Sequence, residues 1–431
     1  HFAVLIGGSA FRTYPIGRDE LGVFFDLAGQ PFTTCPGCDG FGYREPDTDP
    51  LKGAYDFEGS TEREVSSLTA TFEHEFDGFS LTSVTDYLEA EKNYQEDTDS
   101  SPITQVNYFP NAELEQFSQE IRLAGASDTL SWIVGAYYLN LQHDTDTFLY
   151  QDLGQFLGLG PVDPGVFIFE SSMDTELDSE SWAAFGHLEY TLSDTLSVVA
   201  ALRYTYDERE ISYRVEDNFG TVDILDEAGS SSTFDATGLG DFVTIPYQGD
   251  LSSIDFDNYS AKLQLDWRPS DNTLLYLGYT RGHKAGNFST PIAGPSDLSA
   301  LSYDEEVLHS YEAGFKLDLA DGRARLNGGI YYYDYEDYQG FFFTGLVQSV
   351  DNLPAEAYGA ELELTMTPVD GLSIVLGGSY NENEVEDVGM PDGTRQTREL
   401  PHAPDITLNA MVRYEWNLAR GRLAIQGAVD Y

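Results

Sequence analysis

The stretch that most constrains the fold is residues 179–215, which predicts one long β-hairpin. From Leu196 onward the even positions are apolar and the odd positions are mostly small or polar, so the strand has one apolar face. The preceding strand alternates in the same way, and Ser193-Asp194 turns the chain between the two. Each arm exceeds the roughly 5 or 6 residues of an ordinary strand and the roughly 9 to 11 that a tilted strand needs to cross a membrane. The hairpin therefore predicts membrane-spanning strands.

Short turns and long connections alternate along the rest of the chain. Short turns are expected near residues 77, 128, 194, 270, 321, 370 and 420, and longer connections include 96–113, 147–178, 216–255 and 284–304. This asymmetry is typical of transmembrane barrels, which have tight periplasmic turns at one end and long extracellular loops at the other. We therefore predict an all-β fold, a transmembrane antiparallel up-and-down β-barrel of which about 15 strands lie in this chain.

Composition is compatible with a barrel. No run of about 18 apolar residues occurs, which excludes a helical membrane span. The mean hydropathy of −0.32 suits a barrel, because alternation distributes its apolar side chains. The 74 acidic and 22 basic residues give a net charge of −52, which argues against nucleic acid or an anionic membrane surface as a partner. This charge indicates either a solvated acidic exterior or a cation-attracting field concentrated in the loops.

The two cysteines, Cys35 and Cys38, form a CxxC pair. Such a pair can be a redox motif or half of a metal site, but no second pair completes a zinc site and no βαβ pattern surrounds it. We predict a small loop disulfide between them, which implies an oxidising compartment. The chain begins at His1 and stops at Tyr431 inside predicted strands, so we expect both ends of the barrel to be truncated.

Several consecutive segments match one known pattern when they are taken together. They include FSQEIRLAG (117–125), LRYTYDERE (202–210), YTRGHKAGNFS (279–289), VLHSYEAGFKLDLADGRARLNGGIYYYDYEDYQ (307–339) and NLPAEAYGAELEL (352–364). In this order they resemble the barrel of TonB-dependent outer-membrane receptors. The resemblance covers nearly the whole chain, and its specificity comes from the set rather than from any single segment.

The resemblance implies a barrel of about 22 strands, an N-terminal plug in its lumen and import driven by the inner-membrane TonB complex. Residues 1–431 are then all barrel, truncated at both ends, and the plug is not in this chain. The implied location is the outer membrane of a Gram-negative bacterium. The implied partners are outer-membrane lipid, a small-molecule nutrient and, through the plug, the TonB complex. We expect a monomer and neither a cofactor nor a nucleic acid.

The expected function is active import of a scarce nutrient, above all an iron-siderophore complex. Uptake of cobalamin or of an oligosaccharide, a passive porin-like channel and an extracellular adhesin are alternatives. No GxSxG, HExxH or P-loop pattern occurs and the seven histidines are scattered, so we predict neither an enzyme nor a metal site. Loops without positive charge would oppose a polyanionic chelate, which favours a neutral or cationic ligand.

Two segments supply the candidate ligand-binding residues. One is the aromatic stretch 331–343, and the other is the loop opening 283–289. Aromatic faces can stack on sugars or aryl groups while nearby polar groups fix orientation. The predicted ligand-binding residues are Asn287, Phe288, Tyr331, Tyr333, Tyr335, Tyr338 and Phe341; the alternative for the tyrosines is an interfacial girdle and strand packing. Acidic loop pairs could hold Ca²⁺, although none has a known loop spacing: Asp97 and Asp99, Asp144 and Asp146, and Asp223, Asp226 and Glu227.

Overall fold

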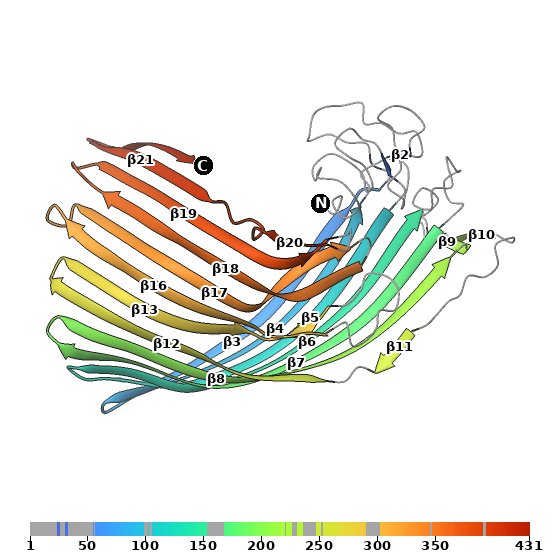
Figure 1. The fold of residues 1–431 in the computed structure, drawn as a ribbon, viewed down its shortest axis with the longest axis horizontal. Helices are drawn as coiled ribbons and strands as arrows, with labels where there is room; N and C mark the ends of the chain where they lie inside the picture. The colour runs from blue at the N-terminus through green and yellow to red at the C-terminus, as the bar shows by residue number, and fades with distance from the viewer. Residues whose placement is uncertain are drawn as a thin grey trace.

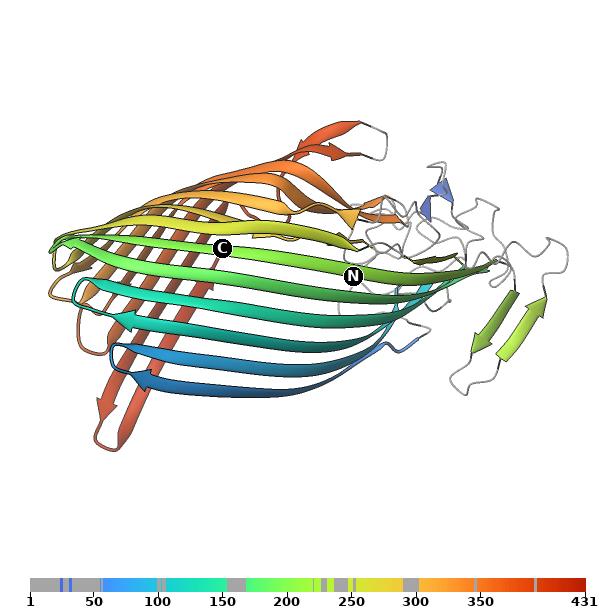
Figure 2. The same cartoon turned by 90° about the horizontal axis from the view of Figure 1, so that it is seen from below.

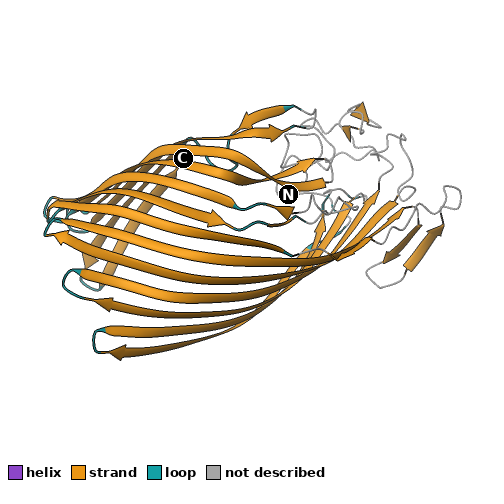
Figure 3. Ribbon diagram, turned by 60° about the horizontal axis from the view of Figure 1, so that its bottom comes forward, coloured by secondary structure: helices purple, strands orange, loops and turns teal. Residues whose placement is uncertain are grey.

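The protein is built from long antiparallel strands, which Figure 1 and Figure 3 show from two directions. The computed structural model describes residues 24–25, 31–32, 55, 57–98, 102, 106–152, 168–219, 221–225, 231–235, 247–250, 253–289, 302–344, 347–390 and 394–431. Cys35, Cys38 and the opening strand predicted before residue 15 lie outside these residues, so the disulfide stays a prediction. Within the described part of the chain, no helix is long and apolar enough to cross a membrane.

One sheet contains nearly all the strands, and two short members, β11 (Tyr247–Asp250) and β20 (Arg395–Arg398), lie off its main path. The remaining 14 pair as sequence neighbours in antiparallel order. They are β3 (Ser60–Phe76), β4 (Phe79–Asp97), β5 (Val106–Ala126), β6 (Leu130–Asp152), β7 (Ile168–Ser193), β8 (Leu196–Phe219), β12 (Ile254–Ser270), β13 (Thr273–Lys284), β16 (Glu306–Leu319), β17 (Ala324–Thr344), β18 (Val347–Met366), β19 (Leu372–Gly389), β21 (Ile406–Leu418) and β22 (Gly421–Asp430).

The remaining described strands form three small sheets of two strands each. They pair β1 (Phe24–Phe25) with β2 (Pro31–Phe32), β9 (Thr221–Leu225) with β10 (Ser231–Asp235), and β14 (Asn287–Phe288) with β15 (Ser302–Tyr303).

All short turns lie at one end of the sheet and the long connections lie at the other (Figure 1). The turns fall between β3 and β4, β5 and β6, β7 and β8, β12 and β13, β16 and β17, β18 and β19, and β21 and β22, as the sequence predicts. Glycine supplies the left-handed backbone where a turn needs it, for example Gly78 with φ of 95°. The antiparallel up-and-down fold is therefore confirmed.

The sheet curls so that its two faces differ (Figure 2). Large apolar side chains lie exposed on one face, among them Leu202, Leu263, Leu277 and Ile330 at 58–63% exposure. Small and polar side chains on the other face are buried, including Ser197, Thr205, Asn258 and Ser310. Side chains converge on the concave side of a curved sheet and diverge on the convex side. The apolar face is therefore convex, and the polar face is concave and lines the lumen.

Aromatic side chains bound the convex apolar band at both ends. Near the short turns lie Tyr190, Trp267 and Trp416, all exposed. The long-loop girdle consists of Tyr87, Trp182, Tyr204, Tyr259, Tyr311, Tyr332, Tyr358 and Tyr380. Trp267 and Tyr259 are eight positions apart on β12, which is about 26 Å along a strand. A tilted strand of that length crosses most of the roughly 25 Å apolar band of an outer-membrane barrel.

Beyond the long-loop girdle, the convex face becomes acidic. Carboxylates lie in register across neighbouring strands, and we call eight of them the acidic collar: Glu64, Glu91, Glu113, Asp144 and Glu176 in one row, and Glu89, Glu115 and Asp178 in the next. Girdle side chains donate hydrogen bonds to carboxylates at this boundary, such as Tyr87 to Glu89 at 2.7 Å and Tyr332 to Glu356 at 2.9 Å. Part of the negative charge therefore lies on the strands themselves and not in the loops.

Several strands extend further toward the long loops than the sequence pattern indicates. β7 begins at Ile168 where the sequence predicts residue 179, and β6 ends at Asp152 where the sequence predicts residue 146. In these extensions apolar side chains occur on both faces among polar ones, for example buried Leu149 and Met173 and exposed Phe148, so the regular alternation that marks a membrane strand is lost. β21 begins at Ile406, after a turn at residues 401–402 and a bend at residue 405.

Candidate functional site

The candidate ligand-binding surface is the concave face of β8 and β16–β19 at the long-loop end. We call it the concave wall and define it by Arg203, Arg209, Tyr331, Tyr333 and Tyr335. In register, Tyr331, Tyr333 and Tyr335 on β17 lie opposite Gly359, Ala357 and Ala355 on β18. The intervening residue Tyr332 points to the convex face and joins the girdle. Alternation therefore separates these tyrosines from the girdle, which leaves strand packing as the alternative to ligand binding.

Tyr331 and Tyr333 form an ordered aromatic pair. Their rings stack with centroids 4.7 Å apart and planes inclined by 28°. The Tyr331 hydroxyl donates to Asn381 Oδ1 at 2.9 Å, and the Tyr333 hydroxyl donates to Glu312 Oε1 at 3.5 Å. Held in this way, the two rings can offer a fixed apolar face to a ligand that enters the lumen.

Tyr335 and Tyr338 lie farther toward the long loops and pack edge to face, with centroids 5.8 Å apart. Both pack against a small apolar core made by Leu353, Ala355, Val385 and Val388. Their rings therefore stabilise the upper part of β17–β19. Whether either ring also contacts a ligand stays a prediction.

Phe341 lies on the opposite face of β17 from Tyr335, although the two residues are six positions apart. A bulge causes this, because the register shifts between Tyr335 and Tyr338, where Asp337 adopts a left-handed φ of 56°. Phe341 is 56% exposed. The sequence treats 331–343 as one aromatic stretch, and the structure divides it between two faces.

Asn287 and Phe288 form the two-residue strand β14, which pairs with β15. Asn287 lies opposite Tyr303, and its side-chain amide hydrogen-bonds the Tyr303 hydroxyl. Burial raises the pKa of Tyr303, while Arg209 and the Asn287 amide act in the opposite direction. Since Arg209 belongs to the concave wall, β14 and β15 lie beside that wall. The structure thus brings both predicted segments, 283–289 and 331–343, to the long-loop end.

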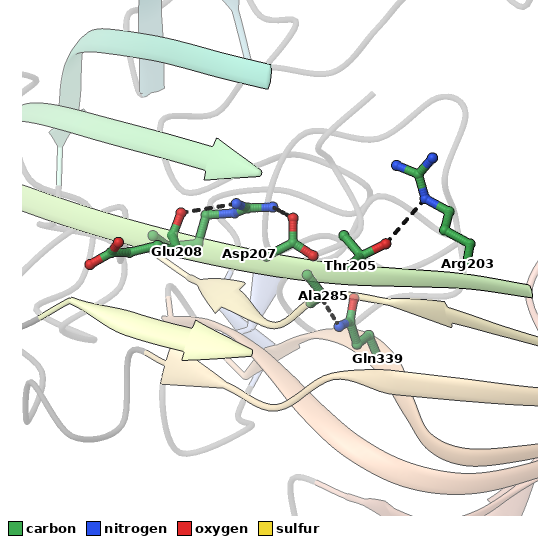
Figure 4. A network of polar contacts seen from close by, with 7 residues as sticks. Arg203, Thr205, Asp207, Glu208, Ala285 and Gln339 are labelled. Atoms are coloured by element: carbon green, nitrogen blue, oxygen red, sulfur yellow. Dashed lines mark hydrogen bonds and ion pairs between the residues drawn. The ribbon is translucent and has the colours of Figure 1, made fainter. Parts of the chain in front are cut away.

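Two arginines that were not predicted from the sequence, Arg203 and Arg209, lie on the concave wall, and Figure 4 labels the first of them. Arg203 donates to Thr205 Oγ1 at 3.1 Å, and its guanidinium lies over the rings of Tyr137 and Phe185 at 5.5 and 5.8 Å. Arg209 lies 3.7 Å from Asp207. The signal was present, because Arg203 and Asp207 both occupy polar positions of the alternating strand β8.

The Tyr331 ring packs against Gly359, and we expect Gly359→Ala to disturb this packing. A Cβ at this position would lie 2.5 Å from the Tyr331 hydroxyl oxygen and 2.7 Å from Tyr331 Cζ, and it would also meet the Tyr380 carbonyl oxygen. We expect a loss of unfolding free energy of about 1–3 kcal/mol from overpacking, measured by urea unfolding. Gly282→Ala is the matched control, because a Cβ there meets nothing within 4 Å. Equal stability of the two variants would contradict the packing described.

Comparison with known proteins identifies the family to which this chain belongs. A profile of the family described as TonB dependent receptor-like, beta-barrel matches residues 7–431. The ferric yersiniabactin uptake receptor FyuA from Yersinia pestis is similar with a TM-score of 0.65 at 18% identity, over 86% of this chain and 50% of that chain. The pyoverdine outer membrane receptor FpvA from Pseudomonas aeruginosa PAO1 gives 0.57 at 13%, over 90% and 53%. The copper transporter OprC gives 0.57 at 13%, over 83% and 50%.

The chain spans about half the length of these solved structures, and likeness at such low identity shows the fold alone. The family profile is the stronger finding, since it covers nearly the whole chain. It also agrees with the antiparallel strand order, the single end of short turns and the convex apolar band. The chain belongs to the TonB-dependent receptor family and forms part of its β-barrel.

Proposed function

We propose that the complete protein imports a ferric siderophore across the outer membrane of a Gram-negative bacterium, with energy supplied by the TonB complex. The observation that carries the proposal is the stacked pair Tyr331 and Tyr333, held on the concave side of a barrel of this family. Structures similar to this one include receptors for ferric yersiniabactin and pyoverdine. The family consists of receptors and transporters, which supports a protein that binds and moves its ligand without chemical change.

We further propose that the complete protein carries the plug and the remaining strands. The support is that β3 and β22 are both open edges of the described sheet, and that related structures are about twice as long. A membrane barrel needs a closed hydrogen-bonded sheet. TonB would act through the plug, lipid would contact the convex band, and one copy would suffice for transport.

The ligand that suits the concave wall is neutral or cationic. Of its two arginines, Arg209 is neutralised by Asp207 and Arg203 lies over aromatic rings. The charge of −52 also repels a polyanion. A neutral ferric siderophore with aryl or hydroxamate groups would combine stacking on the tyrosines with hydrogen bonds to carboxylate and amide oxygens.

Ligand binding to the full-length receptor tests this choice. We expect a neutral ferric siderophore to bind at least about 100-fold more tightly than a ferric chelate with three negative charges, measured by fluorescence quenching in detergent. Cyanocobalamin and a neutral oligosaccharide belong in the same panel, because they are the alternative nutrients. Tighter binding of the charged chelate would overturn the ligand class, and binding of no ligand would favour a passive channel.

A further inference from the structure

Three buried side-chain oxygens near the β14–β15 segment have no hydrogen-bond partner. They are Asn287 Oδ1, Glu305 Oε2 and Gln339 Oε1. Gln339 is only 8% exposed. Leaving a buried acceptor unpaired is unfavourable, and leaving a carboxylate oxygen unpaired is more so. Three such oxygens in one place indicate that something with positive charge or donor groups binds there.

Gln339 places the segments that carry the three oxygens side by side. Its Nε2 donates to the carbonyl oxygens of both Ala285 and Asp304 at 3.0 Å, so its amide lies between the two segments. Asn287 is two positions from Ala285, and Glu305 directly follows Asp304. One unpaired oxygen therefore belongs to Gln339 itself. The other two belong to residues that lie within two positions of the carbonyl groups to which Gln339 donates.

Figure 4 shows the arrangement of the Gln339 amide. Its nitrogen reaches Ala285, and its oxygen turns away from that contact, toward β8 in this view. Two donors on the described neighbouring segments are already engaged. The Asn287 side chain hydrogen-bonds Tyr303 through its amide nitrogen, because Asn287 Oδ1 is unpaired. Arg209 forms an ion pair with Asp207.

We propose that these oxygens bind a divalent cation of the Ca²⁺ type. Calcium prefers carboxylate and amide oxygens, which is the set that Glu305, Asn287 and Gln339 supply, and water completes its 6–8 ligands. With a single carboxylate the affinity should be low, about 10⁻⁴–10⁻³ M, as in extracellular calcium modules. The ion would tie β14 and β15 to β17. It would thus fix the segment that carries Asn287 and Phe288, and this structural role does not depend on the nutrient proposed above.

The acidic collar provides the comparison that a test needs, because its carboxylates also attract cations. The experiment measures the unfolding temperature of the full-length receptor in detergent as CaCl₂ rises, for the wild type, Glu305→Gln and Glu113→Gln. We expect the wild type and Glu113→Gln to gain several degrees, and Glu305→Gln to bind calcium about tenfold or more weakly and gain almost nothing.

A purely structural role of Glu305 predicts a different result without calcium. Glu305→Gln would then destabilise the metal-free receptor. Under our proposal the metal-free variant is at least as stable as the wild type, because the buried Glu305 Oε2 has no hydrogen-bond partner that the substitution would remove. An equal response of all three proteins, or no response of the wild type, would overturn the proposal. Crystals soaked in Sr²⁺ should show an anomalous peak between Glu305 and Gln339, and a peak only along the collar would equally refute it.

Discussion

Ala200→Arg on β8 should cost about 2–4 kcal/mol of folding free energy, the penalty of an arginine on the lipid face at the bilayer midplane. Ala200 lies on the convex face, where its register partners are Leu188 and Leu263. It is four positions from Tyr204 of the long-loop girdle and four from Leu196 at the short turn. The measurement is urea unfolding of the full-length receptor in lipid vesicles.

Ala201→Arg is the matched control, since the residue type is the same and the position differs by one. Ala201 faces the lumen between His187 and Lys262. We expect a cost of no more than about 1 kcal/mol, from the like charge of Lys262 on the neighbouring strand. Equal costs for the two variants would mean that the convex face does not contact lipid.

Residues 1–431 produced without the rest of a receptor should not assemble into a stable monomeric barrel. β3 and β22 are edges of the described sheet, and their 17 and 10 residues would expose unpaired backbone groups to lipid. Each such group costs several kcal/mol in hydrocarbon. The expected result is that outer-membrane extracts show no species whose electrophoretic mobility changes on heating. The full-length protein is the control and should show one. A heat-modifiable monomer from residues 1–431 would mean that β3 and β22 pair directly.

The architecture could be predicted from sequence because membrane strands obey two simple periodicities. Alternation along β8 distinguishes Leu202 on the convex apolar face from Arg203 on the concave face, and Asp77-Gly78 marks a tight turn. Both signals are local, so no knowledge of distant contacts is needed. The signals fail beyond the girdle. There the first residues of β7, from Ile168, lack regular alternation, and the sequence predicts a loop.

The candidate site was only partly accessible from sequence. Tyr331, Tyr333 and Tyr335 share a face because strands alternate, which sequence shows. The bulge beside Asp337 shifts that alternation, and no residue type announces it, so the position of Phe341 could not be predicted. The contacts of Gln339 with Ala285 and Asp304 join segments 54 and 35 positions apart. Such pairing depends on the tertiary fold, which is why sequence reasoning found no cation site at this place.

The most direct test of the account is iron uptake by living cells that carry the full-length protein as their only receptor for a neutral ferric siderophore. Radioactive iron taken up from that siderophore should accumulate during iron starvation and stop when a protonophore collapses the membrane potential. The same loss should follow deletion of the TonB complex. Uptake that continues at an unchanged rate after either treatment would contradict energy-coupled import and identify a passive channel.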